Sequence, residues 1–152
     1  MDYGRSLHEL SRLDDRVALI IGGAGHIGRV SADGLAERGA SIVIVDISAE
    51  RCQAVADELK ARHGVETLAI QANLENETEV KAVPQKVLDV FGRIDILVHL
   101  AAIVDPELGG WTCRFEDQSP AQWRRGLEIN LTSAFCLRKG ASSLFARAAT
   151  AQ

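Results

Sequence analysis

A glycine-rich turn between an apolar run and a helix-forming segment constrains the fold of this chain most strongly. Residues 17–21 are all apolar. The turn that follows reads Gly22-Gly23-Ala24-Gly25-His26-Ile27-Gly28. A short, wholly apolar run is typical of a strand buried on both faces of a parallel sheet. We therefore predict a strand over 16–21 that leads through the turn into a helix over about 26–38, with Gly39 beyond its C-terminal end.

The same alternation of apolar run and helical segment recurs along the chain. Further strands are predicted over 41–46, 65–71 and 95–100, with helices between them that end at Gly64 and Gly92. Strands that alternate with helices imply a parallel sheet with right-handed crossovers and helices on both faces. The sequence thus predicts an α/β, Rossmann-type doubly wound sheet in three αβα layers, with strand order 3-2-1-4.

Three local features set the expected element boundaries. Residues 1–14 are polar without a clear period, so we expect a loose lead-in before a single domain over 15–152. Pro84 lies inside the third helical pattern, where proline costs about 3 kcal/mol, so a kink or a late helix start is expected. Ser119, Pro120 and Gln122 form a capping-box pattern that begins a last helix, predicted to reach Ala146.

Composition excludes several classes of function. The net charge of −4 gives no general attraction to nucleic acid or to anionic membranes. The apolar runs are too short to span a bilayer, and the N-terminus lacks the apolar core of a signal peptide. Three widely spaced cysteines indicate reduced thiols rather than a disulfide framework or a metal cluster. We therefore expect a cytoplasmic protein that binds no metal.

The glycine turn and an acidic residue after the second strand together predict a dinucleotide site. Glycines in such a turn allow a tight bend, a close approach of backbone N–H groups to a diphosphate, and close packing of helix on strand. The helix N-terminus adds unpaired donors and a partial positive charge. Asp46 ends the second strand, where a carboxylate accepts hydrogen bonds from ribose hydroxyls and repels a 2′-phosphate, which favours NAD over NADP. Arg29 is interpreted as a solvated helix residue rather than a phosphate ligand.

From about Asp15 onward these segments resemble the short-chain dehydrogenase/reductase superfamily. The family's turn reads Thr-Gly-x-x-x-Gly-Ile-Gly; here Ile21 replaces the threonine, His26 replaces the middle glycine, and Gly25 fits the Gly-x-x-Gly-x-x-Gly spacing of the extended branch. Residues 91–98 and 129–135 are similar to two further family segments. The resemblance implies hydride transfer between a nicotinamide cofactor and a small alcohol or carbonyl substrate.

The resemblance also implies roles for individual residues. Asn130 matches the family's active-site asparagine, which helps to hold a water in the proton relay, and it is the one catalytic residue expected here. His99 stands where the family has a cofactor-lining asparagine; a structural or lining role is favoured over an acid/base role. The residues expected to bind the cofactor are Gly22, Gly23, Gly25, His26, Ile27, Gly28, Asp46, Ile47, Asn73, Leu74, Ala101 and Ala102.

The family's serine and its Tyr-x-x-x-Lys pair have no counterpart among these residues. The lysine lowers the pKa of the tyrosine, which acts as general acid and base. The only tyrosine here is Tyr3, and the residue four positions on is Leu7. The resemblance therefore implies the cofactor-binding half of such an enzyme, truncated before the fifth strand and inactive alone. The alternatives are a catalytically silent dinucleotide-binding or interaction module, and another Rossmann protein such as a methyltransferase.

Two expectations concern surfaces beside the site. A fourth strand without a fifth beside it would expose unpaired N–H and C=O groups, which predicts marginal stability, self-association or dependence on another chain. Residues 103–118 are the only segment of this sequence that we expect on the substrate side of the site. Trp111 and Phe115 in that loop either line a substrate pocket or serve packing.

Overall fold

The computed structural model describes residues 4, 6–103 and 114–140, and its four parallel strands have the order β3-β2-β1-β4. The predicted strand order 3-2-1-4 is therefore confirmed. The strands are β1 (Val17–Ile21), β2 (Ser41–Asp46), β3 (Thr67–Gln71) and β4 (Ile96–His99). The α-helices are α1 (Leu7–Leu10), α2 (His26–Glu37), α3 (Ala49–His63), α4 (Glu77–Phe91), α5 (Pro120–Leu127) and α6 (Ser133–Gly140). Short helical segments are the 3-10 turn η1 (Phe115–Asp117) and the π-helical η2 (Glu128–Thr132).

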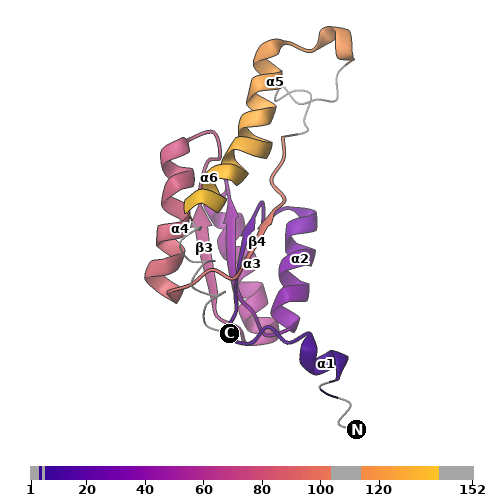
Figure 1. The fold of residues 1–152 in the computed structure, drawn as a ribbon, viewed down its shortest axis with the longest axis vertical. Coiled ribbons are helices and arrows are strands. Elements are labelled where there is room, and N and C mark those ends of the chain that lie inside the picture. The colour runs from indigo at the N-terminus through magenta and orange to yellow at the C-terminus, as the bar shows by residue number, and fades with distance from the viewer. Residues whose placement is uncertain (1–3, 5, 104–113, 141–152) are drawn as a thin grey trace.

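Helices cover both faces of the sheet and form the predicted three layers (Figure 1). Successive strand residues point to opposite faces, so β1 sends Ala18 and Ile20 to one side and Leu19 to the other. The first side packs against α2 and α3, and the second packs against α4 and α6. The strands β1 and β2 are almost wholly buried, which explains why their sequences are continuous apolar runs.

Polar and glycine residues fix the helix ends as the sequence predicts. The Ser48 side chain accepts a hydrogen bond from the N–H of Arg51 at the start of α3. Ser119 and Gln122 form the expected capping box at the start of α5. Gly64 and Gly92 end α3 and α4 with φ of +70°, a conformation that glycine adopts without a Cβ penalty.

Three helix predictions differ from the structure in part. The lead-in contains the short helix α1, because Ser6 and Glu9 form a reciprocal capping box that the polar composition concealed. Of the two effects expected of Pro84, the late start is wrong, because α4 begins at Glu77 and continues past the proline, and the kink stays a prediction. Pro84 is buried, and its ring lies where a Cβ on Gly140 would come within 3.0 Å, so packing against α6 accommodates it. The last helix is not continuous α-helix: η2 separates α5 from α6, and its predicted end at Ala146 lies outside the described residues.

The amino end of β4 is fixed by a buried carboxylate. Only 6% of the Asp95 side chain is exposed, and it accepts hydrogen bonds from the backbone N–H of Val17 at 2.8 Å and from Arg93 at 2.6 and 2.8 Å. Arg16 adds a contact at 3.1 Å. Burial raises the pKa of the Asp95 carboxyl, but these hydrogen bonds outweigh it and hold the pKa below its usual value. The carboxylate thus links the starts of β1 and β4.

The other end of β4 is joined to the helical layer through His99. Its Nε2 lies 2.9 Å from Oγ of Ser133, a buried residue at the start of α6. That hydroxyl donates its single proton to the carbonyl of Ile129 at 2.5 Å, so Nε2 of His99 is the donor in the contact with Ser133. Burial lowers the pKa of the His99 imidazole, which favours the neutral ring, with its proton on Nε2.

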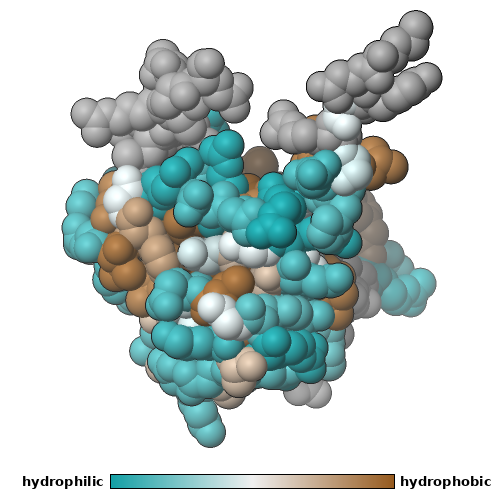
Figure 2. All heavy atoms as spheres, turned by 90° about the horizontal axis from the view of Figure 1, so that it is seen from below, coloured by the Kyte–Doolittle hydropathy of each residue, from teal (hydrophilic) through white to brown (hydrophobic). Residues whose placement is uncertain are grey.

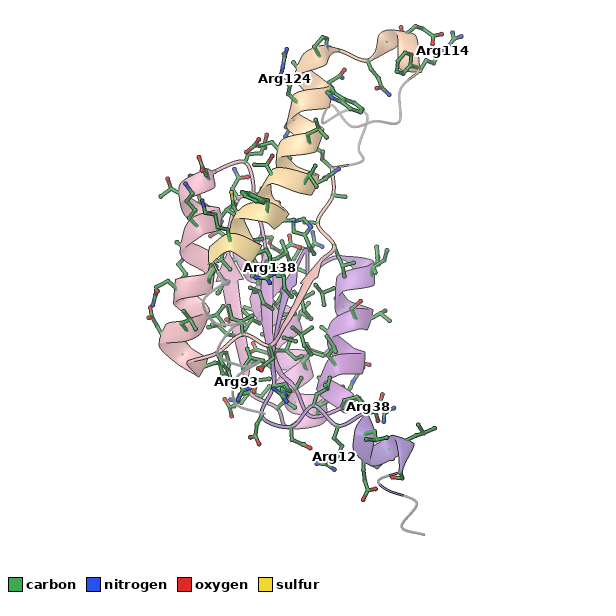
Figure 3. The ribbon with its side chains drawn as sticks, viewed as in Figure 1. Arg12, Arg38, Arg93, Arg114, Arg124 and Arg138 are labelled. Atoms are coloured by element: carbon green, nitrogen blue, oxygen red, sulfur yellow. The ribbon has the colours of Figure 1, made fainter. Side chains whose placement is uncertain are left out.

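The strand β4 is the edge of the described sheet on one side. It pairs with β1, no described strand lies on its other side, and its four residues are only half-buried. None of the described helices is long and apolar enough to cross a membrane. Seen from below, the surface is mostly hydrophilic with separate hydrophobic patches (Figure 2), and Arg12, Arg38 and Arg93 lie toward this lower end (Figure 3).

Asp95→Asn should lower the free energy of unfolding by about 2 kcal/mol, because the buried side chain loses its charge-assisted bonds to the two arginines. Urea unfolding followed by circular dichroism measures this. Asp57→Asn is the matched control, because Asp57 is exposed and its side chain accepts a hydrogen bond from Gln53 within its own helix. Equal losses in the two variants would contradict the role assigned to Asp95.

The stability of the chain should fall on mild acidification because of His99. Its pKa in the folded state lies below the usual value of about 6.5, so the unfolded chain binds the proton more readily. The stabilisation is therefore complete above about pH 6.5 and is lost as the pH falls further. Urea midpoints at pH 7.5 and 5.5 should differ less in His99→Gln than in the wild type, whereas His8→Gln, at an exposed position, should retain the wild-type difference. A His99→Gln difference as large as that of the wild type would exclude the imidazole as its source.

Candidate functional site

A cleft of about 330 Å³ lies at the carboxyl edge of the sheet. Segments that follow all four strands contribute to it, together with α5 and η2. The chain crosses from β3 on one side of β1 to β4 on the other, so the cleft lies at the point where the strand order reverses. Open α/β sheets bind their ligands at this point. The lining residues are Ile21, Gly22, Gly25, Val45, Asp46, Ile47, Ala72, Asn73, Leu74, Glu75, Leu100, Ala101, Ala102, Ile103, Arg125 and Ile129.

Two glycines of the turn are required by the packing of the chain itself. A Cβ on Gly22 would lie 2.6 Å from the backbone nitrogen of Ala101, and Gly22 has a φ of +76°. A Cβ on Gly28 would lie 2.2 Å from the carbonyl oxygen of Gly22. The backbone N–H groups of Gly22 and Gly23 both donate to the carbonyl of Val45, at 2.8 and 3.1 Å. The turn is therefore fixed between β2 and the segment after β4.

Gly25 is different, because the protein leaves the space beside it open. A Cβ there would make one tight contact, with the carbonyl oxygen of Gly22 at 3.2 Å, no described atom outside the turn and α2 lies within 4 Å, and Gly25 lines the cleft. Gly25 is also the N-cap of α2, where it provides no side chain to accept from the first N–H groups. By contrast, side chains cap α1, α3, α4 and α5. A helix N-terminus without a side-chain cap, beside open space, fits an anionic group such as a diphosphate.

Asp46 lines the cleft next to this turn. One of its carboxylate oxygens accepts a hydrogen bond from the N–H of Ile47 at 2.9 Å, and the residue is half-buried. The backbone of Ile47 is held in turn, since its carbonyl accepts from the side chain of Gln71 at 3.2 Å. A carboxylate fixed by its own backbone in this way can accept hydrogen bonds from the hydroxyls of a bound sugar.

The segment after β3 is shaped by hydrogen bonds of Asn73. Its side-chain oxygen accepts from the N–H of Glu75 at 3.0 Å, and its own N–H donates to the Glu79 carboxylate at 2.8 Å. Asn73 thus uses one of the two lone pairs of its side-chain oxygen within the turn. Leu74 is half-buried and packs against the core cluster on the α4 side.

An ion pair closes the cleft between this segment and α5. Nε and Nη2 of Arg125 donate to the two carboxylate oxygens of Glu75 at 2.7 and 3.0 Å. The hydrogen bonds from Arg125 hold the pKa of Glu75 below its usual value. The sequence analysis missed both residues, and no local signal marks them, because they are far apart in sequence and meet only in the fold.

Asn130 and His99 lie beside the cleft but do not line it. The side-chain oxygen of Asn130 accepts from the N–H of Ile103 at 3.2 Å, so Asn130 positions a lining residue from within the π-helical segment. His99 contacts Ser133, as described above. This contact fits a structural role for the imidazole rather than that of an exposed acid or base. The catalytic role of Asn130 remains a prediction.

Eight of the twelve predicted cofactor-binding residues are brought together in the cleft. They are Gly22, Gly25, Asp46, Ile47, Asn73, Leu74, Ala101 and Ala102. Gly23 and Gly28 are instead buried in the packing of the turn, and His26 and Ile27 are exposed on α2. Trp111 lies outside the described residues, and Phe115 is exposed.

Two arginines near the turn are engaged by groups of the protein itself. Arg29 forms an ion pair with Glu58 at 2.5 Å and so is engaged away from the turn. Arg51, which the sequence analysis did not consider, donates from Nη2 to the carbonyl oxygen of Ala24 at 2.6 Å. Its position in the first turn of the helix after Asp46 was the signal that could have found it. Among the described residues, no group of three or more histidine, cysteine, aspartate or glutamate side chains could hold a metal ion.

Comparison with known proteins finds dehydrogenases and reductases among the relatives of this chain. Residues 16–151 match the short chain dehydrogenase family. The (2S)-((R)-hydroxy(phenyl)methyl)succinyl-CoA dehydrogenase subunit BbsD of Thauera aromatica is 38% identical over 123 residues, which cover 81% of this chain and 47% of the relative. The 3-oxoacyl-(acyl-carrier-protein) reductase FabG of Aquifex aeolicus is 32% identical over 82% of this chain and 48% of the relative. The chain thus spans about half the length of the curated relatives it matches.

Solved structures of similar proteins share the fold, and this chain covers about half of each. NAD+-bound xylitol dehydrogenase superposes with a TM-score of 0.77 at 28% identity, covering 86% of this chain and 48% of the other. The NADP complex of RhlG from Pseudomonas aeruginosa superposes with a TM-score of 0.79 at 31% identity, covering 90% and 50%. The cleft described above therefore stands in a family with known nicotinamide-dinucleotide complexes, and the chain belongs to the short-chain dehydrogenase family.

Proposed function

We propose that this chain is the cofactor-binding half of an NAD-dependent oxidoreductase that transfers hydride between the nicotinamide and an alcohol or carbonyl substrate. The observation that carries the proposal is the uncapped N-terminus of α2 at Gly25, beside open space in the cleft. Every other α-helix with a described N-cap uses a side chain there. A bound diphosphate would accept the hydrogen bonds that a capping side chain provides elsewhere.

Different groups of lining residues would contact different parts of a bound dinucleotide. The glycine turn would hold the diphosphate, and Asp46 would accept hydrogen bonds from the adenosine ribose. The half-buried Leu74 and its neighbours after β3 would contact the adenine, while Ala101 and Ala102 after β4 would lie along the nicotinamide side. The bound nicotinamide supplies the hydride chemistry, and the chain supplies its binding and orientation.

The choice of NAD over NADP rests on the charge of Asp46. A carboxylate at the ribose repels a 2′-phosphate, so binding of NADP beside this negative charge is unfavourable. Relatives with known complexes include both an NAD+-bound and an NADP-bound protein, so membership of the family leaves this choice to the local residues.

Turnover by this chain alone is not expected. The serine, tyrosine and lysine that the family uses for proton transfer have no counterparts here, and Asn130 by itself only helps to hold a water. We further propose a cytoplasmic location, a small-molecule substrate and self-association through the half-buried edge strand β4. The alternative is a catalytically silent dinucleotide-binding module. The absence of the serine, tyrosine and lysine from this sequence is compatible with that alternative too.

Gly25→Val should raise the dissociation constant for NADH at least tenfold, because the new side chain fills the space beside the N-terminus of α2. Nicotinamide fluorescence measures binding, and circular dichroism confirms that the variant is folded. Gly34→Val is the control: it places the same side chain in the same helix, where no atom lies within 4 Å, and should bind NADH as the wild type does. Equal weakening in both variants would remove the support for a diphosphate at Gly25.

The purified chain should bind NADH without oxidising it in the presence of aldehydes or ketones, because it lacks the residues for proton transfer. Absorbance at the nicotinamide band follows turnover, and the fluorescence titration follows binding. Turnover would show that other groups perform the proton transfer. A folded chain without affinity for NADH would contradict the proposed function and its silent alternative together.

A further inference from the structure

We propose that Glu75 and Arg125 form a clasp, an ion pair between the two walls of the cleft that slows the release of the bound dinucleotide. The proposal rests on the proposed dinucleotide-binding function. Both residues line the cleft, and both lie outside the glycine turn and the end of β2. They act on the ligand through each other, as positioning residues, by holding the walls together.

The two walls of the cleft come from strands on opposite sides of β1. One wall is the segment 72–75, which follows β3. The other is the segment 100–103 after β4, together with Arg125 of α5 and Ile129 of η2. Both β2 and β1 lie between β3 and β4 in the sheet, so no strand pairing joins the two walls directly. Side-chain bonds between the walls therefore affect how readily the cleft opens.

Two such bonds lead from one wall to the other through α5 and η2. Arg125, in the last turn of α5, donates to the two carboxylate oxygens of Glu75 at 2.7 and 3.0 Å. In η2, which follows directly, the side-chain oxygen of Asn130 accepts from the N–H of Ile103 at 3.2 Å. The helix α5 itself extends beyond the carboxyl edge of the sheet (Figure 1). The ion pair thus holds the base of this projecting helix against the wall that follows β3.

The geometry of the pair fits a bond that holds the walls and still opens. A bidentate arginine–carboxylate pair has a fixed orientation and is stronger than a single contact. The backbone of Glu75 is fixed as well, because its N–H donates to the side chain of Asn73 at 3.0 Å. The side chains of Glu75 and Arg125 are 39% and 37% exposed, so water solvates both charges when the pair separates. Exposed pairs contribute little to folding, and the loss of this one should therefore appear in ligand release rather than in stability.

Stopped-flow fluorescence of the full chain measures this release, with excess NAD+ displacing bound NADH. Glu75→Gln and Arg125→Gln should each speed release about threefold, the effect expected of an exposed ion pair. The double variant should release NADH no faster than either single variant, because the first substitution already breaks the pair. Arg125→Lys, which keeps the charge but not the planar fork, should fall between the wild type and Arg125→Gln.

The direction of the two single effects separates a clasp from a simple effect of charge. NADH is an anion, so the loss of a nearby carboxylate would by itself slow its release, and the loss of a nearby guanidinium would speed it. A clasp requires that both substitutions speed release. Opposite directions, unchanged release in either single variant, or effects that add in the double variant would each overturn the proposal.

Glu77→Gln is the matched control. It makes the same charge change two residues from Glu75 and breaks an ion pair with Lys81 that lies within α4, and neither residue lines the cleft. It should leave the release rate unchanged, and an acceleration equal to that of Glu75→Gln would also overturn the clasp. Circular dichroism confirms that each variant is folded. A wild type that does not bind NADH would contradict the proposed function itself, and the clasp with it.

Discussion

The contact between Gly28 and the carbonyl of Gly22 determines how the rest of the site is built. A Cβ on Gly28 would lie 2.2 Å from that oxygen, so only glycine lets α2 begin so close to the end of β1. Because the helix begins there, its N-terminus opens onto the cleft at the carboxyl edge of the sheet. The backbone bonds from Gly22 and Gly23 to Val45 then bring Asp46 beside the same turn. One close approach therefore places both the donors proposed for a diphosphate and the acceptor proposed for a ribose.

The glycines of the turn serve two different purposes, which the sequence pattern does not separate. Gly22 and Gly28 are required by contacts within the protein, whereas Gly25 leaves space that the protein does not fill. Substitution of the first two is expected to disturb folding, and substitution of Gly25 is expected to disturb binding. A glycine pattern read from the sequence thus combines a requirement of the fold with a requirement of the ligand.

The parts of the molecule that the sequence predicts are those set by local patterns. The wholly apolar runs of β1 and β2, the Ser48 and Ser119 caps and the αL glycines at 64 and 92 each depend on neighbouring residues, and each was predicted correctly. Contacts between distant segments were not predictable in this way. The packing of Pro84 at Gly140, the pairing of Glu75 with Arg125 and the reach of Arg51 to Ala24 depend on how whole elements come together.

The two anchors of β4 have a consequence for how any further strand would join this sheet. Asp95 fixes one end of β4 to β1, and His99 fixes the other end to the helical layer through Ser133. The side of β4 that no described strand covers therefore offers its backbone donors and acceptors at positions held from both ends. A further strand that pairs there would form its hydrogen bonds with a backbone that is already held in place at both ends.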